Sequence, residues 1–313
     1  MGASSSRKNS IMINKYVLTL PHGINLSCRS VGEKGRPVLL FLHGFPEAAF
    51  VWDELLTYFA KPENGGYRCI APNLRGFELS SAPTDVSAYR PKHLVQDIAA
   101  LIASESAPVD GLIAHDWGGA VAWTMAASQP QLIKKLAIIN SPHPGTFLRE
   151  LQHSSTQQAA SAYMNFLIRP DAEKLLAEDD FRRLFEFFTS FSSVKKTEAV
   201  RVAPGWLTDD VRAQYRNAWQ SGLTGSLNFY RASPLRPGPE IANVIIPREL
   251  LEVNLRTLVL WGMDDIALPP TLLDGLANYV PRMELKKIEG ATHWIIHEQP
   301  ALVARYLQDF LNS

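Results

Sequence analysis

One acidic residue stands where a buried strand is expected to pass directly into a helix. The segment AHDWGG, residues 114–119, lies between an apolar run and a stretch rich in small residues, and it contains Asp116. In a nucleophile elbow, a sharp strand-to-helix turn holds one side chain above the sheet, and neighbouring small residues let the backbone bend tightly. An aspartate before a helix is also a common N-terminal cap, so this motif alone leaves both interpretations open.

Three further motifs favour the elbow. The sequence HGFP at 43–46 follows an apolar run where an oxyanion loop belongs, so the backbone N–H groups of Phe45 and Trp117 can converge on one oxygen. The sequence WGMDD at 261–265 ends another apolar run, and GATH at 290–293 follows the last one. The chain order is therefore nucleophile, acid and histidine, which is the order that the elbow motif requires.

The rest of the chain must supply the elements that hold these motifs. Two β-like runs at 15–20 and 24–31 are separated by a Pro-His-Gly turn signal and predict an opening hairpin. Apolar runs that predict buried strands then alternate with stretches of helical periodicity. Strands are expected at 38–42, 67–71, 111–114, 135–139, 257–261 and 283–288, and helices at 50–59, 93–104, from 117 onwards, 272–279 and 300–311. This alternation predicts an α/β fold with a mostly parallel sheet and helices on both faces.

The alternation stops after the sequence NSPHP at residues 140–144. Roughly a hundred residues follow with helical periodicity and no convincing buried strand, which predicts an inserted helical cap. We therefore expect a disordered leader at 1–12, a discontinuous core made of 13–142 and 243–313, and a cap at 143–242. The core is thus built from both ends of the chain.

The composition disfavours several classes of protein. Lys plus Arg and Asp plus Glu both number 31, so no global field attracts nucleic acid or repels acidic substrates, and a small uncharged substrate is expected. Cys28 and Cys69 lie in apolar runs and are too few for a disulfide scaffold, which predicts buried free thiols in a reducing compartment. No apolar run approaches the ~18–20 residues of a membrane span, and no secretion signal is recognised, so a cytoplasmic protein is expected.

The first residues carry a feature at odds with that expectation. Met1 and Gly2 are followed by Ser6 and two basic residues, which matches a pattern for acylation of Gly2 in a eukaryotic cell. A plain disordered leader is the alternative. Met12 could equally be the true start of the protein.

The four motifs resemble the epoxide hydrolase branch of the α/β-hydrolase family, and the resemblance spans nearly the whole chain after the leader. It implies an α/β-hydrolase fold with Asp116 as the nucleophile, His293 as the base and Asp265 as the acid that orients the base. Asp265 is the fifth residue of the pattern WGxxD, although the neighbouring Asp264 leaves the choice of acid open. A conventional serine esterase is disfavoured because no serine occupies the elbow.

A carboxylate nucleophile indicates chemistry on saturated carbon. It can attack a carbon that bears a leaving oxygen or halogen, and water then splits the resulting ester in a second step. His293 would be the general base for that water, while Asp265 would fix its tautomer and the oxyanion pair would serve this second step. We expect a hydrolase acting on ether bonds that opens an epoxide to a vicinal diol through an ester on Asp116. Its partners would be an uncharged epoxide and water, with no cofactor or metal.

Opening an epoxide also requires an acid for the departing alkoxide. A tyrosine suits this role because its pKa of ~10 keeps it protonated at pH 7. Tyr163 in the sequence SAYMNF and Tyr230 in LNFYRA are similar to the cap tyrosines of epoxide hydrolases, where such a pair faces the nucleophile. The alternative is that both are amphipathic helix residues with buried rings and solvated hydroxyls.

Four other histidines lie in or near these motifs. We expect them to pack or to bond to the backbone rather than to catalyse. They are His43, His115, His143 and His297.

Two alternatives to an epoxide hydrolase remain open. A haloalkane or haloacetate dehalogenase would use the same nucleophile, but halide release needs N–H donors, and Phe45 in the oxyanion loop offers no side-chain donor. A haloacetate dehalogenase would also need cationic groups beside the nucleophile to bind the carboxylate of its substrate, and residues 118–121 supply none. The second alternative is a non-catalytic ligand-binding protein of the same fold. The complete set of Asp116, Asp265 and His293 argues against it.

Overall fold

A computed structural model describes residues 12–105, 107–190 and 203–313 of the chain. Within these ranges the strands form one sheet in the order β1-β2-β4-β3-β5-β6-β7-β8. The strands are β1 (Asn14–Thr19), β2 (Asn25–Val31), β3 (Val38–Leu42), β4 (Arg68–Pro72), β5 (Gly111–His115), β6 (Lys135–Ile139), β7 (Arg256–Gly262) and β8 (Met283–Ile288). β1 pairs antiparallel with β2 and β2 with β4, and the other neighbouring pairs are parallel. The expected α/β fold with a mostly parallel sheet is confirmed.

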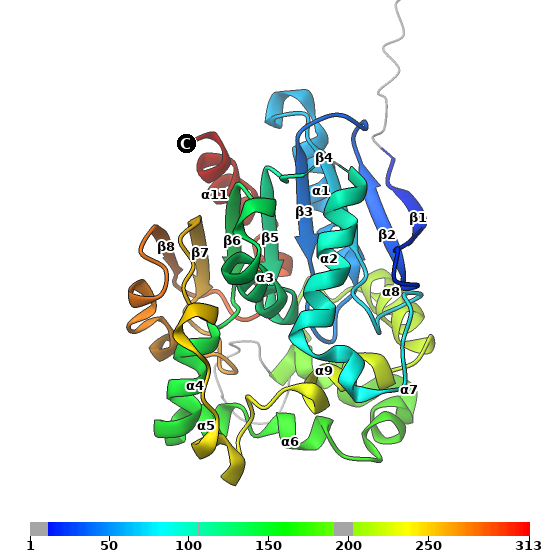
Figure 1. The fold of residues 1–313 in the computed structure, drawn as a ribbon. Helices are drawn as coiled ribbons and strands as arrows, with labels where there is room; N and C mark the ends of the chain where they lie inside the picture. The colour runs from blue at the N-terminus through cyan, green and yellow to red at the C-terminus, as the bar shows by residue number, and fades with distance from the viewer. Residues whose placement is uncertain (1–11, 106, 191–202) are drawn as a thin grey trace, which may run out of the picture.

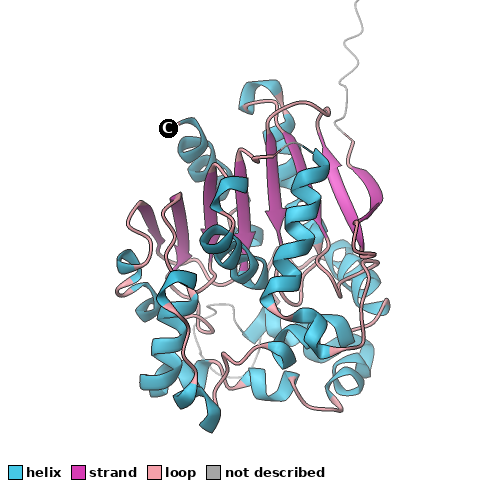
Figure 2. Cartoon of the chain, viewed as in Figure 1, coloured by secondary structure: helices cyan, strands magenta, loops and turns pink. Residues whose placement is uncertain are grey.

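Helices lie on both faces of this sheet and at one end of it (Figure 1). The helices of the core are α1 (Asp53–Ala60), α2 (Pro91–Glu105), α3 (Asp116–Ser128), α10 (Ile295–Glu298) and α11 (Pro300–Asn312). The helices between β6 and β7 are α4 (Pro144–His153), α5 (Ser155–Ala160), α6 (Tyr163–Leu167), α7 (Ala172–Ser190), α8 (Asp209–Gln220) and α9 (Thr224–Ala232). Figure 2 shows the described part of this stretch as helices and loops.

Each central strand contributes to two apolar clusters, because successive side chains of a strand point to opposite faces of the sheet. In β5, Ile113 belongs to the cluster that contains Phe59 of α1 and Phe310 of α11. Its neighbour Leu112 belongs to the cluster that contains Val121 of α3. The sheet is therefore covered by α1 and α11 on one face and by α2 and α3 on the other, and burial of these side chains is the main source of stability.

The helices between β6 and β7 gather at one end of the sheet (Figure 1). The longest of those described, α7, is interrupted at 178–181, where Asp179, Asp180 and Phe181 have left-handed φ angles of 52°, 56° and 60°. This group of helices is called the helical insertion below. The predicted boundaries of a cap domain at 143 and 242 stay a prediction.

One predicted element is wrong. The stretch 272–279, expected as one helix, forms two separate 3₁₀ turns, Pro270–Leu273 and Leu276–Asn278. Gly275 between them has a φ of 70°, in the left-handed region where helices commonly end. The predicted opening hairpin is confirmed, since β1 and β2 pair antiparallel.

Three expectations about the whole chain can now be compared with the structure. The leader up to residue 11, and with it the acylation pattern at Gly2, lies outside the described residues. Cys28 and Cys69 are buried and free, as predicted. Among the residues described, none of the helices combines the length and the apolar character that crossing a membrane requires.

Candidate active site

Asp116 lies at a tight turn between β5 and α3. Its φ is 48°, in the left-handed region that aspartate adopts more readily than most residues. A Cβ at Gly118 would lie 2.5 Å from the backbone oxygen of Leu42, and a Cβ at Gly119 would lie 2.3 Å from the side chain of Ser141. Ser141 also donates its hydroxyl hydrogen to the backbone oxygen of Asp116, at 2.6 Å. These contacts fix the elbow and hold the carboxylate beyond the end of the sheet.

The loop after β3 approaches this carboxylate closely. The backbone N–H of Phe45 donates to Asp116 Oδ1 at 2.7 Å. The approach depends on Gly44, because a Cβ there would lie 2.3 Å from the same oxygen. Trp117 is the second residue of α3, where a backbone N–H has no acceptor within its own helix. The structure thus shows the Phe45 N–H bonded to Asp116, while the oxyanion role of the Phe45 and Trp117 N–H groups stays a prediction.

Four donors hold Asp265 in the loop after β7. Its Oδ2 accepts from His293 Nδ1 at 2.7 Å and from Asn140 Nδ2 at 2.8 Å. Its Oδ1 accepts from the backbone N–H groups of residues 267–268, both at 2.9 Å. These bonds compensate for burial of the carboxylate. The neighbouring Asp264 is exposed, so the contact with His293 belongs to Asp265.

His293 lies between two carboxylates. Its Nδ1 donates to Asp265, and its Nε2 lies 3.6 Å from Asp116 Oδ2. Burial alone would lower the pKa of His293, but the charge and hydrogen bond of Asp265, together with the charge of Asp116, raise it to about 9. The imidazole therefore carries a proton at neutral pH.

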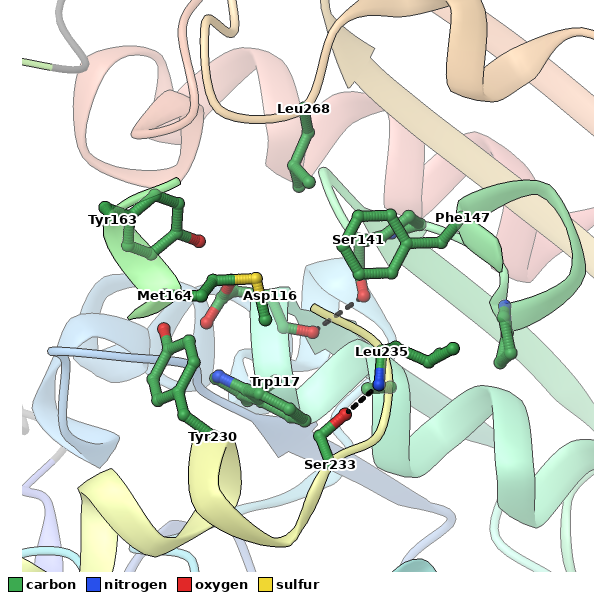
Figure 3. A pocket seen from close by; sticks show the side chains of 13 residues that line it. Asp116, Trp117, Ser141, Phe147, Tyr163, Met164, Tyr230, Ser233, Leu235 and Leu268 are labelled. Carbon is green, nitrogen blue, oxygen red and sulfur yellow. Dashed lines mark hydrogen bonds between the residues drawn. The ribbon is translucent and has the colours of Figure 1, made fainter. Parts of the chain in front are cut away.

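Two tyrosines from the helical insertion face Asp116. Tyr163 begins α6 and Tyr230 lies in α9, with ring centroids 6.3 Å apart. Figure 3 shows both hydroxyls pointing towards the space around the Asp116 carboxylate. Burial raises the pKa of Tyr163, and the charges of Asp116 and Asp265 raise it further. The pKa of Tyr230 is raised well above its usual value by burial and then by Tyr163 and Asp116, so both hydroxyls are protonated at neutral pH.

A cavity with an empty volume of about 520 Å³ lies beside these groups (Figure 3). It is lined by Asp116, Trp117, Ala120, Ser141, Pro142, Pro144, Phe147, Tyr163, Met164, Tyr230, Ser233, Leu235 and Leu268. Asp116 is the only acidic or basic side chain among these lining residues. A second cavity of about 240 Å³ shares Asp116 and both tyrosines and is also lined by His293. The arrangement suits an uncharged, largely apolar molecule placed between a carboxylate and two phenols.

The structure brings together the seven site residues that the sequence indicates: Asp116, His293, Asp265, Tyr230, Tyr163, Phe45 and Trp117. It adds two that the sequence analysis missed. Asn140 and Ser141 follow β6, the strand next to β5, and they bond to Asp265 and Asp116. A signal for them was available in the sequence, because the carboxyl ends of neighbouring parallel strands meet at one edge of the sheet.

Two of the remaining motif histidines bond to the backbone, as predicted. His43 Nε2 accepts from the N–H of Leu74 at 3.1 Å. His143 Nδ1 accepts from the N–H of Gly145 at 3.1 Å, at the start of α4. Neither one lines the two cavities. Among the residues described, His, Cys, Asp and Glu side chains form no group of three that could hold a metal ion.

The other two motif histidines meet a buried carboxylate, Glu47, which the sequence analysis did not single out. His115 Nδ1 lies 2.9 Å from Glu47 Oε2, and His297 Nε2 lies 3.1 Å from Glu47 Oε1. The second nitrogen of His115 lies 2.9 Å from the backbone oxygen of His293. Burial alone would raise the pKa of Glu47, but His115 and His297 hold it well below its usual range. Through the contact of His115 with the backbone oxygen of His293, this cluster helps to hold the backbone of His293 in place.

Known proteins resemble the chain along most of its length. A family model described as alpha/beta hydrolase fold matches residues 37–300. AB hydrolase superfamily protein YfhM of Bacillus subtilis is 32% identical over 93% of this chain and 96% of its own. Epoxide hydrolase 4 of Mus musculus is 33% identical over 95% of this chain and 79% of its own. The crystal structure of Bacillus megaterium epoxide hydrolase with an inhibitor is 30% identical, with a TM-score of 0.84 over 95% of this chain and 100% of that one.

Proposed function

The chain belongs to the alpha/beta hydrolase family, in the branch of the epoxide hydrolases, and from this premise we propose that it hydrolyses epoxides to vicinal diols. The observation that carries the proposal is the placement of two protonated tyrosine hydroxyls opposite the Asp116 carboxylate, in an otherwise uncharged cavity. A carboxylate nucleophile and a phenolic acid are together what opening an epoxide requires. In this proposal the cap, residues 143–242, supplies the acid, and the core supplies the nucleophile and the base.

In the first step, Asp116 attacks a carbon of the epoxide ring. The backbone N–H of Phe45 holds Oδ1, so Oδ2 is the attacking oxygen. A bond forms between Oδ2 and the carbon, the ring C–O bond breaks, and a proton passes from Tyr163 or Tyr230 to the departing oxygen. The step leaves an ester on Asp116 and one tyrosine as a phenolate.

Ester formation changes the charge around His293. Before the attack, the negative charge of Asp116 contributes to the raised pKa of His293. The ester is neutral, so this contribution is lost and the pKa falls. The imidazolium then gives its proton, directly or through water, to the phenolate of Tyr163 or Tyr230, because the phenol has the higher pKa. A histidine that rests protonated thus becomes the neutral base that the second step needs.

In the second step, neutral His293 takes a proton from water while the water oxygen adds to Cγ of the Asp116 ester. The negative charge that develops on Oδ1 is stabilised by the N–H groups of Phe45 and Trp117, and Asp265 stabilises the imidazolium. The bond between Cγ and Oδ2 breaks, and the departing oxygen takes the second proton of that water. The diol therefore keeps Oδ2, and Asp116 gains an oxygen from solvent.

Product analysis tests this function. Wild-type protein and an Asp116→Ala variant would be incubated with styrene oxide, an aliphatic epoxide, a haloalkane and a haloacetate. We expect diol from an epoxide with the wild type only, because the variant has no nucleophile. Halide release without diol would favour a dehalogenase, and binding without any product would favour a non-catalytic ligand-binding protein.

A further inference from the structure

The two tyrosines that face Asp116 have different surroundings. The ring of Tyr230 stands nearly perpendicular to the indole of Trp117, with centroids 5.1 Å apart and an angle of 87°, and it also contacts Phe45 at 5.2 Å. Only 2% of Tyr230 is exposed. Tyr163 instead contacts Phe187 of α7, at 5.8 Å. Tyr230 therefore packs against side chains that the core holds in place, whereas Tyr163 packs within the helical insertion.

The indole of Trp117 directs its N–H group towards Tyr230. Figure 3 shows the indole nitrogen on the side of Trp117 that faces Tyr230. Burial raises the pKa of Tyr230 most, and Tyr163 raises it further. A hydrogen bond between the side chains of Trp117 and Tyr230 acts in the opposite direction and lowers this pKa. An indole N–H can only donate, so the phenolic oxygen of Tyr230 is the acceptor. Such a bond becomes stronger when the acceptor is an anion, as it is after Tyr230 has given up its proton.

We propose that Trp117 is a positioning residue for the acid step, because its indole N–H orients the Tyr230 hydroxyl and stabilises the phenolate that remains after ring opening. The inference rests on the proposed function and makes Tyr230, rather than Tyr163, the main acid. In a dehalogenase, an N–H donor such as this indole would be needed for the departing halide. Under the present proposal the indole N–H of Trp117 instead donates to Tyr230.

The backbone and the side chain of Trp117 then serve different steps. Its backbone N–H belongs to the oxyanion pair, which acts when water adds to the ester. Its indole N–H acts earlier, when the epoxide ring opens. The substitution Trp117→Phe separates the two roles, because it keeps the backbone N–H and an aromatic ring and removes only the indole donor.

The test follows the two half-reactions separately in single turnovers of one epoxide, styrene oxide, with rapid quenching and mass spectrometry of the protein. Trp117→Phe is expected to slow ester formation about tenfold, as fits the loss of a hydrogen bond to a charged group. Hydrolysis of the ester is expected to stay within about twofold of the wild-type rate. Thermal unfolding of each variant checks that the fold is retained.

A double-mutant comparison makes the test specific to Tyr230. In a Tyr230→Phe background, Trp117→Phe is expected to cause no further slowing of ester formation, because the acceptor is already absent. In the matched Tyr163→Phe background, the same substitution is expected to cause the full slowing of about tenfold, because Tyr230 is then the remaining acid.

Two results would overturn the inference. One is an equal slowing of ester formation by Trp117→Phe with and without the Tyr230 hydroxyl, and the other is an equal slowing of both half-reactions, which indicates a packing role. Failure of the proposed function looks different. In that case the wild-type protein itself forms neither an ester nor a diol from the epoxide.

Discussion

The core and the helical insertion hold their parts of the site in different ways. Asp116, Asp265 and His293 follow strands of the sheet, and backbone contacts or short hydrogen bonds fix each of them. Tyr163 and Tyr230 come from α6 and α9, and contacts between aromatic rings place them. The proposed nucleophile Asp116 and the proposed base His293 therefore depend on backbone geometry, whereas the proposed tyrosine acid depends on side-chain packing. A change in the insertion can therefore remove the proposed chemistry with little loss of stability, while a small change at the elbow is expected to affect both.

Loss of both tyrosine hydroxyls from the insertion has the largest expected effect. The double substitution Tyr163→Phe and Tyr230→Phe should slow ester formation by about 10²–10⁴-fold, because no acid remains for the departing alkoxide. Both rings remain, so the free energy of unfolding should change by less than about 1 kcal/mol. Rapid-quench kinetics and urea unfolding measure the two quantities.

A tyrosine outside the cavity provides the control. The buried hydroxyl of Tyr89 donates to the backbone oxygen of Pro83 at 2.9 Å, and Tyr89 lines neither cavity. Tyr89→Phe should keep ester formation within about twofold of the wild type. Rapid ester formation in the double variant would remove the tyrosines from the mechanism and would favour a substrate whose leaving group needs no acid.

The pH dependence of stability tests how the core holds His293. The pKa of His293 is raised from 6.5 to about 9, so the stabilisation from its imidazolium is fully present below about 6.5 and is lost as the pH rises through about 9. The difference in unfolding free energy between the wild type and His293→Gln should therefore shrink by about 1–3 kcal/mol between about pH 6 and about pH 10. Urea unfolding across this range measures it. A difference that stays constant with pH would mean that the carboxylates do not hold the imidazolium.

A single methyl group at the elbow tests the dependence on backbone geometry, with a smaller expected effect. Gly119→Ala should lower the free energy of unfolding by about 1–2 kcal/mol and also reduce turnover, because the new Cβ would lie 2.3 Å from Ser141. The matched control is Gly205→Ala, where the Cβ meets no described atom within 4 Å. Unfolding by urea and turnover of an epoxide are measured together. Unchanged values of both in Gly119→Ala would show that the elbow tolerates displacement and would weaken the contrast between core and insertion.

The core half of the site could be predicted from the sequence because each of its motifs is local. A strand end, a tight turn and a glycine occur within a few residues of each other around Asp116, and the fifth position of the pattern WGxxD favours Asp265. Only the structure separates Asp265 from Asp264, because Asp265 contacts His293 and Asp264 is exposed. The predicted helix at 272–279 failed for an equally local reason, since Gly275 adopts a left-handed φ of 70° that helical periodicity does not reveal.

The rest of the site depends on contacts between segments far apart in the chain. Glu47 meets His297 across 250 positions, and the cavity wall includes Phe147, Met164 and Leu235 from different parts of the insertion. No spacing within one segment indicates such contacts, because they arise only when the helices pack over the end of the sheet. The sequence could therefore suggest a role for two cap tyrosines, but not that the indole of Trp117 packs against the ring of Tyr230.

A single turnover in water enriched in heavy oxygen tests most directly whether Asp116 forms a covalent ester. With the wild type, we expect the first diol to carry an unlabelled oxygen from Asp116, and the peptide that contains Asp116 to gain the label. With His293→Gln, ester hydrolysis should slow by orders of magnitude, so the intact protein should gain the mass of one substrate on that same peptide. A first diol that takes its new oxygen from the labelled solvent, together with no adduct in the variant, would contradict the ester. Asp116 would then be a base or an orienting group for direct attack by water.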